Sequence, residues 1–173
     1  MTDGVGAAFD ALWALSSVAA GVSGVARWNE ADGWYGALNN DAAWTPRPAA
    51  YVWSLLNSRV ARLGGAAGSA ALVAAAASAP SNVTIFAAIA AAAAPPATHS
   101  YVIIVINTSG EDARVALDVA AWGGVAPLPA AAVETAVVTG AGLAVGATTI
   151  GAITAAGGVD LPADAVAFWT FAR

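Results

Sequence analysis

The chain has 173 residues, of which 59% are hydrophobic and only 10% charged, enough for one domain, or one small domain with an appendage, around a sizeable apolar core. Its six basic residues, all Arg, face eleven acidic ones and give a net charge of −5, which disfavours binding to nucleic acid and to anionic membranes. The absence of cysteine excludes disulfides, thiolate metal sites and cysteine nucleophiles.

The beginning of the chain and its alanine-rich stretches predict neither a signal peptide nor a membrane span. The chain begins with Asp3 and Asp10 and has no basic region before an apolar run, as a signal peptide would have. The apolar stretches 64–79 and 83–94 are too weak or too short for a span, which needs about 20 consecutive apolar residues. We therefore expect no membrane partner. The location stays open, and is extracellular if a longer parent protein is secreted.

The first third of the chain is predicted to begin with a helix and a strand. Between Gly6 and Ala20 apolar side chains recur at helical spacing, and Gly21 stands where a helix stop belongs. Residues 22–28 then read as a short buried strand. The helix face expected to be buried is formed by Phe9, Leu12, Trp13, Ser16 and Ala20, widened by Leu15 and Val18.

A long polar and aromatic loop follows, and a second helix ends the first third. Thr45 is predicted to be the N-cap, with Pro46 at the first helical position, and Gly64 to be the stop. Trp44 is expected to pack against the helix start. The expected apolar stripe is Trp53, Leu56, Val60 and Leu63, which makes Trp53 a core residue.

After Gly65 the pattern changes to short strands separated by turn sequences, which is typical of an antiparallel sheet or sandwich. The strand over 100–109 is apolar on both faces, as expected of a central strand, and the strand over 113–122 alternates, as expected nearer an edge. The predicted fold class is mainly β, an antiparallel β-sandwich preceded by a helix–strand–helix segment. The six predicted strands are 82–90, 100–109, 113–122, 132–140, 147–155 and 165–173.

The most informative feature is the aromatic loop, because residues 24–53 hold four of the seven tryptophans. An indole offers a flat apolar surface that suits the C–H faces of a sugar ring. Polar side chains that could bind hydroxyl groups surround it: Asn29, Glu30, Asp32, Asn39, Asn40 and Asp41. The alternative for Trp28, Trp34 and Tyr35 is packing or a protein partner surface.

The order of several segments resembles the C-terminal end of a clan-A glycoside hydrolase, closest in character to β-xylosidase-like and β-glucuronidase/heparanase-like enzymes. These segments are "GVSGVARW", "WYGALNND", "WTPRPAAYVWSLLN", "VIIVINTS" and "VDLPADAVAFWTF". The resemblance implies that residues 1–64 are the last part of a (β/α)8 barrel and that residues 65–173 are an accessory β-sandwich domain.

The same resemblance implies a substrate-binding role for part of the loop. Trp28 would end the last barrel strand and floor the subsite of the reactive sugar, and Asn29 would follow it. Trp34 and Tyr35 would line the same cleft, with Glu30 among the residues that contact substrate.

No catalytic residue is expected in this chain. Retaining enzymes of this clan use two carboxylates about 5–5.5 Å apart, and the resemblance places both upstream of Met1. Glu30 and Asp32 are close in sequence, but this spacing is more typical of surface residues. The chain would then be inactive alone, with carbohydrate and the barrel portion of a longer polypeptide as its partners.

A second interpretation is a self-standing carbohydrate-binding or protein-interaction module. The strand over 22–28 separates the two, because a lone barrel strand would expose an apolar edge, whereas a module should pair it or cover it with the helices. No cofactor or metal is expected, since His99 is the only histidine and cysteine is absent. Asn82 and Asn107 match glycosylation sequons, which matter only in a secreted protein.

Overall fold

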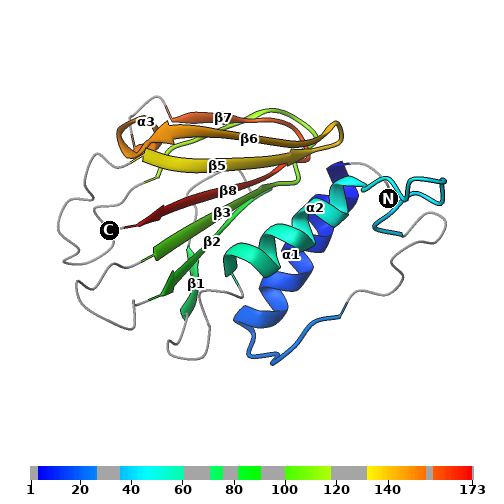
Figure 1. The fold of residues 1–173 in the computed structure, drawn as a ribbon. Coiled ribbons are helices and arrows are strands. Elements are labelled where there is room, and N and C mark those ends of the chain that lie inside the picture. Colours follow the sequence, from blue (N-terminus) through cyan, green and yellow to red (C-terminus); the bar gives the residue numbers. More distant parts are fainter. Residues whose placement is uncertain are drawn as a thin grey trace.

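The computed structural model describes residues 4–26, 36–60, 71–75, 82–90, 100–117, 132–154 and 158–172. Their strands form a six-stranded antiparallel sheet and a separate two-stranded one, and two helices lie against the larger sheet (Figure 1). The predicted mainly-β fold with an antiparallel sheet and an N-terminal helical segment is therefore confirmed.

The larger sheet has the strand order β1-β2-β3-β8-β5-β6, and all of its neighbours are antiparallel. The smaller sheet pairs β4 (Ala113–Val115) with β7 (Val159–Leu161), and a short helix, α3 (Ile150–Thr154), follows β6. The strands of the larger sheet are β1 (Ala71–Ala75), β2 (Val83–Ala90), β3 (Ser100–Asn107), β5 (Ala132–Thr139), β6 (Gly142–Thr149) and β8 (Val166–Ala172).

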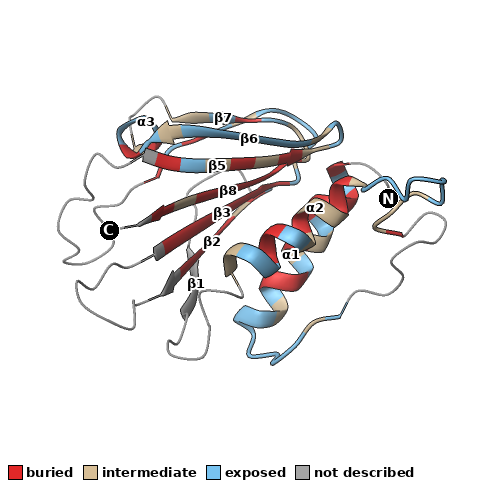
Figure 2. Ribbon diagram, viewed as in Figure 1, coloured by how far each residue is buried: buried red, intermediate tan, exposed pale blue. Residues whose placement is uncertain are grey.

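The sheet has a separate hydrophobic cluster on each face. Toward the helices, alternate residues such as Ile104 and Phe168 join a cluster that includes α1 and α2. On the opposite face, Ile103 and Trp169 join a cluster with β4, β7 and α3. β3 is thus buried on both faces, as predicted for a central strand, and Figure 2 shows β3 and β8 as the most buried part of the sheet.

Strands 82–90, 100–109, 132–140 and 165–173 were predicted to within about two residues, but the strand predicted over 147–155 is wrong. There β6 ends at Thr149 and α3 begins at Ile150. β6 shows no buried alternation, so the period-2 signal that marks a half-buried strand is missing from its sequence. Of the predicted strand 113–122, residues 113–115 form β4, and residues beyond 117 lie outside the described part of the chain.

The first helix, α1 (Gly4–Ala19), forms as predicted but buries a different face. Apart from Leu15, which belongs to the predicted face, its buried side chains are small: Ala7, Ala8, Ala11 and Ala14. Phe9 is 52% exposed and Trp13 42% exposed. Alanines let the helix approach its neighbours closely, so close packing rather than side-chain size selects the buried face. Gly21 ends the helix as predicted, with a φ of +89° and its N–H donating to the Val18 carbonyl at 3.0 Å.

The second helix begins later than predicted. α2 spans Pro48–Leu55, with Arg47 as N-cap and Pro48 in the first turn, and continues as a π-helix, η1 (Leu56–Val60). Thr45 and Pro46 are therefore outside the helix. Val52, Leu55 and Leu56 are buried, whereas Trp53 is half-buried against the same cluster.

The strand predicted over 22–28 is not formed in its described part. Residues 22–26 are in no strand, and all except Val25 are exposed. The N-terminal helices and the sheet instead share one buried cluster. The boundary predicted at residue 64 lies outside the described residues, so the division into two domains stays a prediction.

η1 is fastened to the sheet by Arg59. Its Nη1 donates to Thr170 Oγ1 at 2.7 Å, and its Nη2 contacts the Glu134 carboxylate. Thr170 and Glu134 are register partners on β8 and β5, so a single guanidinium bridges two neighbouring strands.

Two of the segments that carry the resemblance meet at Asn107. Its buried amide donates to the carbonyls of Glu111 at 2.8 Å and Pro162 at 2.9 Å, and its backbone N–H donates to the Ala165 carbonyl at 2.9 Å. The asparagine of "VIIVINTS" therefore holds the segment "VDLPADAVAFWTF" against the end of β3. Its role in this structure is architectural.

Candidate functional site

The five predicted substrate-binding residues, Trp28, Asn29, Glu30, Trp34 and Tyr35, lie outside the described residues. The segment that follows them, residues 36–47, is described and leads directly into α2. We refer to residues 36–47 as the aromatic-loop turn. It lies at the N-terminal end of α2 (Figure 1).

The aromatic-loop turn is closed by backbone hydrogen bonds. Leu38 and Pro46 form an isolated antiparallel bridge. The Asn39 N–H donates to the Thr45 carbonyl at 2.8 Å, and the Arg47 N–H donates to the Ala37 carbonyl at 2.8 Å. These contacts bring the two ends of the turn together, so that residues 40–44 form its tip.

Asp41 organises the tip. Its Oδ1 accepts hydrogen bonds from the N–H of Thr45 at 3.0 Å and of Ala43 at 3.2 Å. Its carbonyl accepts the Trp44 N–H at 3.1 Å. Because these donors stabilise the charged carboxylate, the Thr45 N–H above all, they hold the pKa of Asp41 below its usual range.

Arg47 fixes the other end of the turn. Its Nε donates to Asn39 Oδ1 at 2.7 Å and its Nη1 to the Gly36 carbonyl at 3.2 Å. The N-cap residue of α2 thereby also anchors the turn, which sets the turn's position relative to the helix.

The result is a tryptophan presented to solvent. Trp44 is 51% exposed and has a φ of +51°, a backbone conformation that costs a bulky residue free energy and is found mainly where the surroundings impose it. The prediction that Trp44 packs against the helix start is wrong. The helix begins four residues later, at Pro48, so Trp44 falls in the turn.

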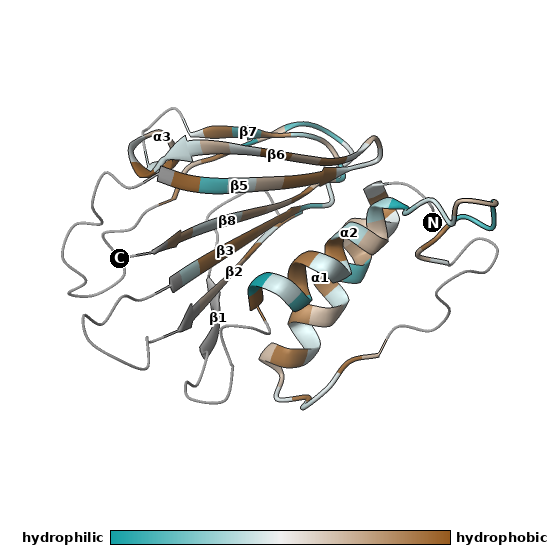
Figure 3. Cartoon of the chain, in the orientation of Figure 1, coloured by the Kyte–Doolittle hydropathy of each residue, from teal (hydrophilic) through white to brown (hydrophobic). Residues whose placement is uncertain are grey.

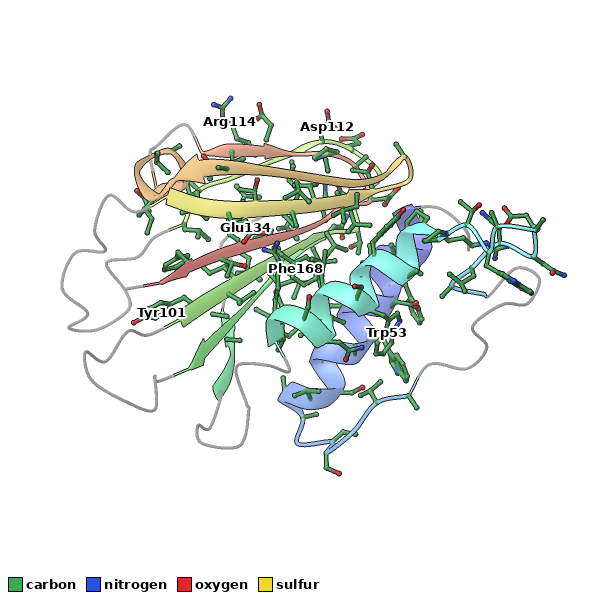
Figure 4. The ribbon with its side chains drawn as sticks, viewed as in Figure 1. Trp53, Tyr101, Asp112, Arg114, Glu134 and Phe168 are labelled. Atoms are coloured by element: carbon green, nitrogen blue, oxygen red, sulfur yellow. The ribbon has the colours of Figure 1, made fainter. Side chains whose placement is uncertain are left out.

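A second group of aromatic side chains lies along α1 and α2. The rings of Trp13 and Trp53 meet edge to face, with centroids 6.4 Å apart and an interplanar angle of 66°. Trp53 Nε1 donates to Asp10 Oδ2 at 3.1 Å and so ties the two helices together. Figure 4 labels Trp53 next to these helices. Trp53 is thus used for packing, in agreement with its predicted structural role, although it is not fully buried.

The aromatic-loop turn places apolar and polar groups side by side on the surface. It combines a flat apolar ring with exposed amide and carboxylate groups, and Figure 3 shows hydrophilic and hydrophobic residues next to each other along it. Among the described residues, no three potential metal-ligating side chains gather into one group. Neither is any described helix long and apolar enough to cross a membrane.

Trp44 is the binding candidate that the sequence interpretation missed. The signal was present in Asp41, whose side chain caps tight turns and stands three residues before the tryptophan. The sequence "TPRP" instead led to a predicted helix start at Thr45 and Pro46, because either of its prolines suits the first turn of a helix. No family model matches the sequence, and no curated protein matches it.

Proposed function

We propose that this chain binds carbohydrate through the segment between α1 and α2 and does not hydrolyse it alone. The observation that carries this proposal is Trp44, an indole held in solvent by a turn that its own neighbours fix in place. A ligand-binding aromatic that is rigid before binding loses little conformational entropy on binding, which favours affinity.

A sugar is the ligand that best fits this surface. The C–H face of a pyranose is flat and apolar and stacks on an indole, while its hydroxyl groups seek amides and carboxylates at the rim. Asn40 and Asp41 supply such groups beside Trp44, and both are exposed. Trp28, Asn29, Glu30, Trp34 and Tyr35 are proposed to extend the same binding surface.

The resemblance to clan-A glycoside hydrolases supplies the wider context. The chain would be the C-terminal portion of a retaining enzyme that acts on polysaccharides or glycosides. The acid/base and the nucleophile would come from a longer polypeptide. We expect the chain alone to show no turnover of aryl glycosides; turnover that survives purification and is lost in Glu30→Gln would contradict this.

A self-standing binding module is the second candidate, and one observation favours it. α1 and α2 bury one face of the sheet in a shared cluster, and residues 22–26 form no strand that would need barrel neighbours. The size of the native polypeptide, detected with an antibody against the strand-rich part, separates the two. A native protein larger by about the 250 residues of a barrel favours the enzyme portion, and one of 16.9 kDa favours the module.

Carbohydrate binding itself is tested with Trp44→Ala. Calorimetric titration with xylo-oligosaccharides and uronic acid-containing glycans should detect binding by the unchanged chain. Loss of the stacking contact, worth about 1 kcal/mol, should weaken it by roughly fivefold to tenfold. The matched control is Trp13→Ala. Trp13 is also a partly exposed tryptophan, but it lies on α1, so its substitution should leave the affinity unchanged. Absence of binding by the unchanged chain, or equal binding by Trp44→Ala, would contradict the proposal.

A further inference from the structure

The edge strand β6 has an open side. Within the described strands it pairs only with β5, which leaves the backbone groups on its outer side without a strand partner. Natural edge strands are commonly protected by charged residues, proline or a bulge. β6 (GLAVGATT) contains no charged residue and no proline, and its register with β5 is unbroken over all eight residues.

The side chains of β6 add an apolar surface to this open edge. Leu143 is 38% exposed and Val145 is 64% exposed. Both lie opposite residues of β5, Val138 and Ala136, that point toward the helices and are buried. The helices therefore cover β5 but leave β6 largely uncovered, as Figure 2 shows.

The sequence that forms and flanks β6 is also free of charge. Residues 135–159 contain no Asp, Glu, Lys or Arg, although the whole chain carries a net charge of −5. Glu134, which lies opposite Ala147 in the register, is paired with Arg59. Two copies of an acidic chain repel each other over most of their surface, and β6 is a place where that repulsion is absent.

Both ends of the strand are held in place. At its start, Gly142 adopts a φ of +118°, which closes a tight turn from β5, and the Ala141 N–H donates to Thr139 Oγ1 at 3.1 Å. At its end, α3 follows at once, with Ile150 and Ile153 buried beneath the sheet. The edge is thus presented as a fixed template for pairing.

We propose that two copies of this chain pair through β6, antiparallel and related by a two-fold axis, so that their sheets become continuous. A two-fold axis at Val145 places Val145 opposite the same residue of the other copy and Leu143 opposite Ala147. Every residue pair in this arrangement is uncharged, so the strand is complementary to itself, as an isologous interface requires. The inference does not depend on carbohydrate binding.

The absence of natural cysteine gives a direct test of this register. Under oxidising conditions Val145→Cys should form a disulfide-linked dimer, because antiparallel partners place their Cβ atoms about 4.5–5.5 Å apart. The matched control is Leu143→Cys, whose two copies would lie four strand positions apart and should not cross-link. Equal cross-linking of both variants, or of neither, would overturn the proposed register.

Dimer formation is measured by sedimentation over a wide range of protein concentration. The unchanged chain should dimerise, and Val145→Lys, which sets two like charges against each other, should raise the dissociation constant about tenfold or more. Val5→Lys, an exposed apolar position on α1, should leave it unchanged. Because Val145 is exposed, the substitution should not alter thermal unfolding of the monomer. A chain that stays monomeric, or a dimer that survives Val145→Lys, would overturn the proposal.

Discussion

Asn107, at the end of β3, makes several hydrogen bonds through its side chain. Besides its bonds to Glu111 and Pro162, its Oδ1 accepts the N–H of Ser109 at 3.0 Å and the hydroxyl of Ser109 at 2.6 Å. It is fully buried. A glycan on its amide would replace one of the two N–H donors and require space that the core does not offer, whereas Asn82, in the other sequon, is exposed.

We predict that Asn107→Ala lowers the free energy of unfolding by about 2–3 kcal/mol, because the fully buried Asn107 amide is the donor to the carbonyls of Glu111, Leu161 and Pro162. Chemical denaturation measures this change, with Asn57→Ala, an exposed position in η1, as the control. If both variants lose the same stability, the buried hydrogen bonds of Asn107 do not stabilise the fold. In a secretory host, mass spectrometry should find Asn107 without a glycan.

Asp41 gives the aromatic-loop turn a dependence on pH. Its folded-state pKa is lowered by the N–H donors of the turn, so the carboxylate stabilises the turn at every pH above its unfolded-state pKa of about 3.9. That stabilisation is lost as the pH falls through the folded-state pKa. We therefore predict that the turn opens only in acid.

An NMR titration of the Asp41 carboxyl carbon should show a midpoint below the value for free aspartate, and the amide signals of Ala43 and Thr45 should move with it. In Asp41→Asn the same amide signals should no longer titrate. A carboxyl midpoint at or above about 3.9 would contradict the prediction.

The position of Trp44 shows why the exposure of a single side chain was harder to predict than the presence of the nearby helix. Its exposure depends on where α2 begins, and the sequence offers two prolines, Pro46 and Pro48, that both suit a first helical turn. Backbone contacts between Asn39 and Thr45 decide between them. Such contacts join residues on opposite sides of the turn, so no local pattern contains them.

Among the elements, α1 shows the limit of hydrophobic periodicity. Two stripes of the same helix satisfy the helical spacing, one with Phe9 and Trp13 and one of alanines. Side-chain size favours the first, but the alanine stripe is the one that packs in the cluster beneath the sheet. The sequence therefore predicted the helix and its end correctly, but of the predicted buried face only Leu15 is buried and Leu12 partly buried in the cluster.

We predict that Ala11→Leu destabilises the protein by about 1–3 kcal/mol, because the added atoms must enter a closely packed interface. Phe9→Ala removes far more apolar surface, but from the solvent-facing side, so the change should stay within about 0.5 kcal/mol. Thermal unfolding of the two variants measures both. The reverse order of effects would mean that the large residues form the buried face.

For the whole molecule, the central strands were predictable and their order was not. Strands β2, β3, β5 and β8 carry dense Val, Ile and Phe, which mark them as strands whatever their neighbours are. The placement of β8 between β3 and β5 depends on pairings far apart in the chain. The described parts of the helical and the strand-rich segments share one buried cluster, while the predicted boundary between them lies outside the described residues.

The shared core leads to a prediction about cleavage. A protease site inserted at Gly64–Gly65 should allow the chain to be cut into a helical and a strand-rich fragment. We expect the fragments to co-elute on gel filtration, because residues such as Val52 and Phe168 are buried in one cluster, and to separate in denaturant. Separation without denaturant would show that the two segments are independent domains.

The strand order also governs how the protein can be made. β5 is translated some thirty residues after β3, and the strand that lies between them in the sheet, β8, is translated after both. Until then the larger sheet can form only in two parts, the β1–β2–β3 meander and the β5–β6 hairpin, and each part has an unpaired apolar edge strand. We expect folding of the sheet to wait for the synthesis of residues 166–172, so that a premature stop before them yields two half-sheets that are prone to aggregate.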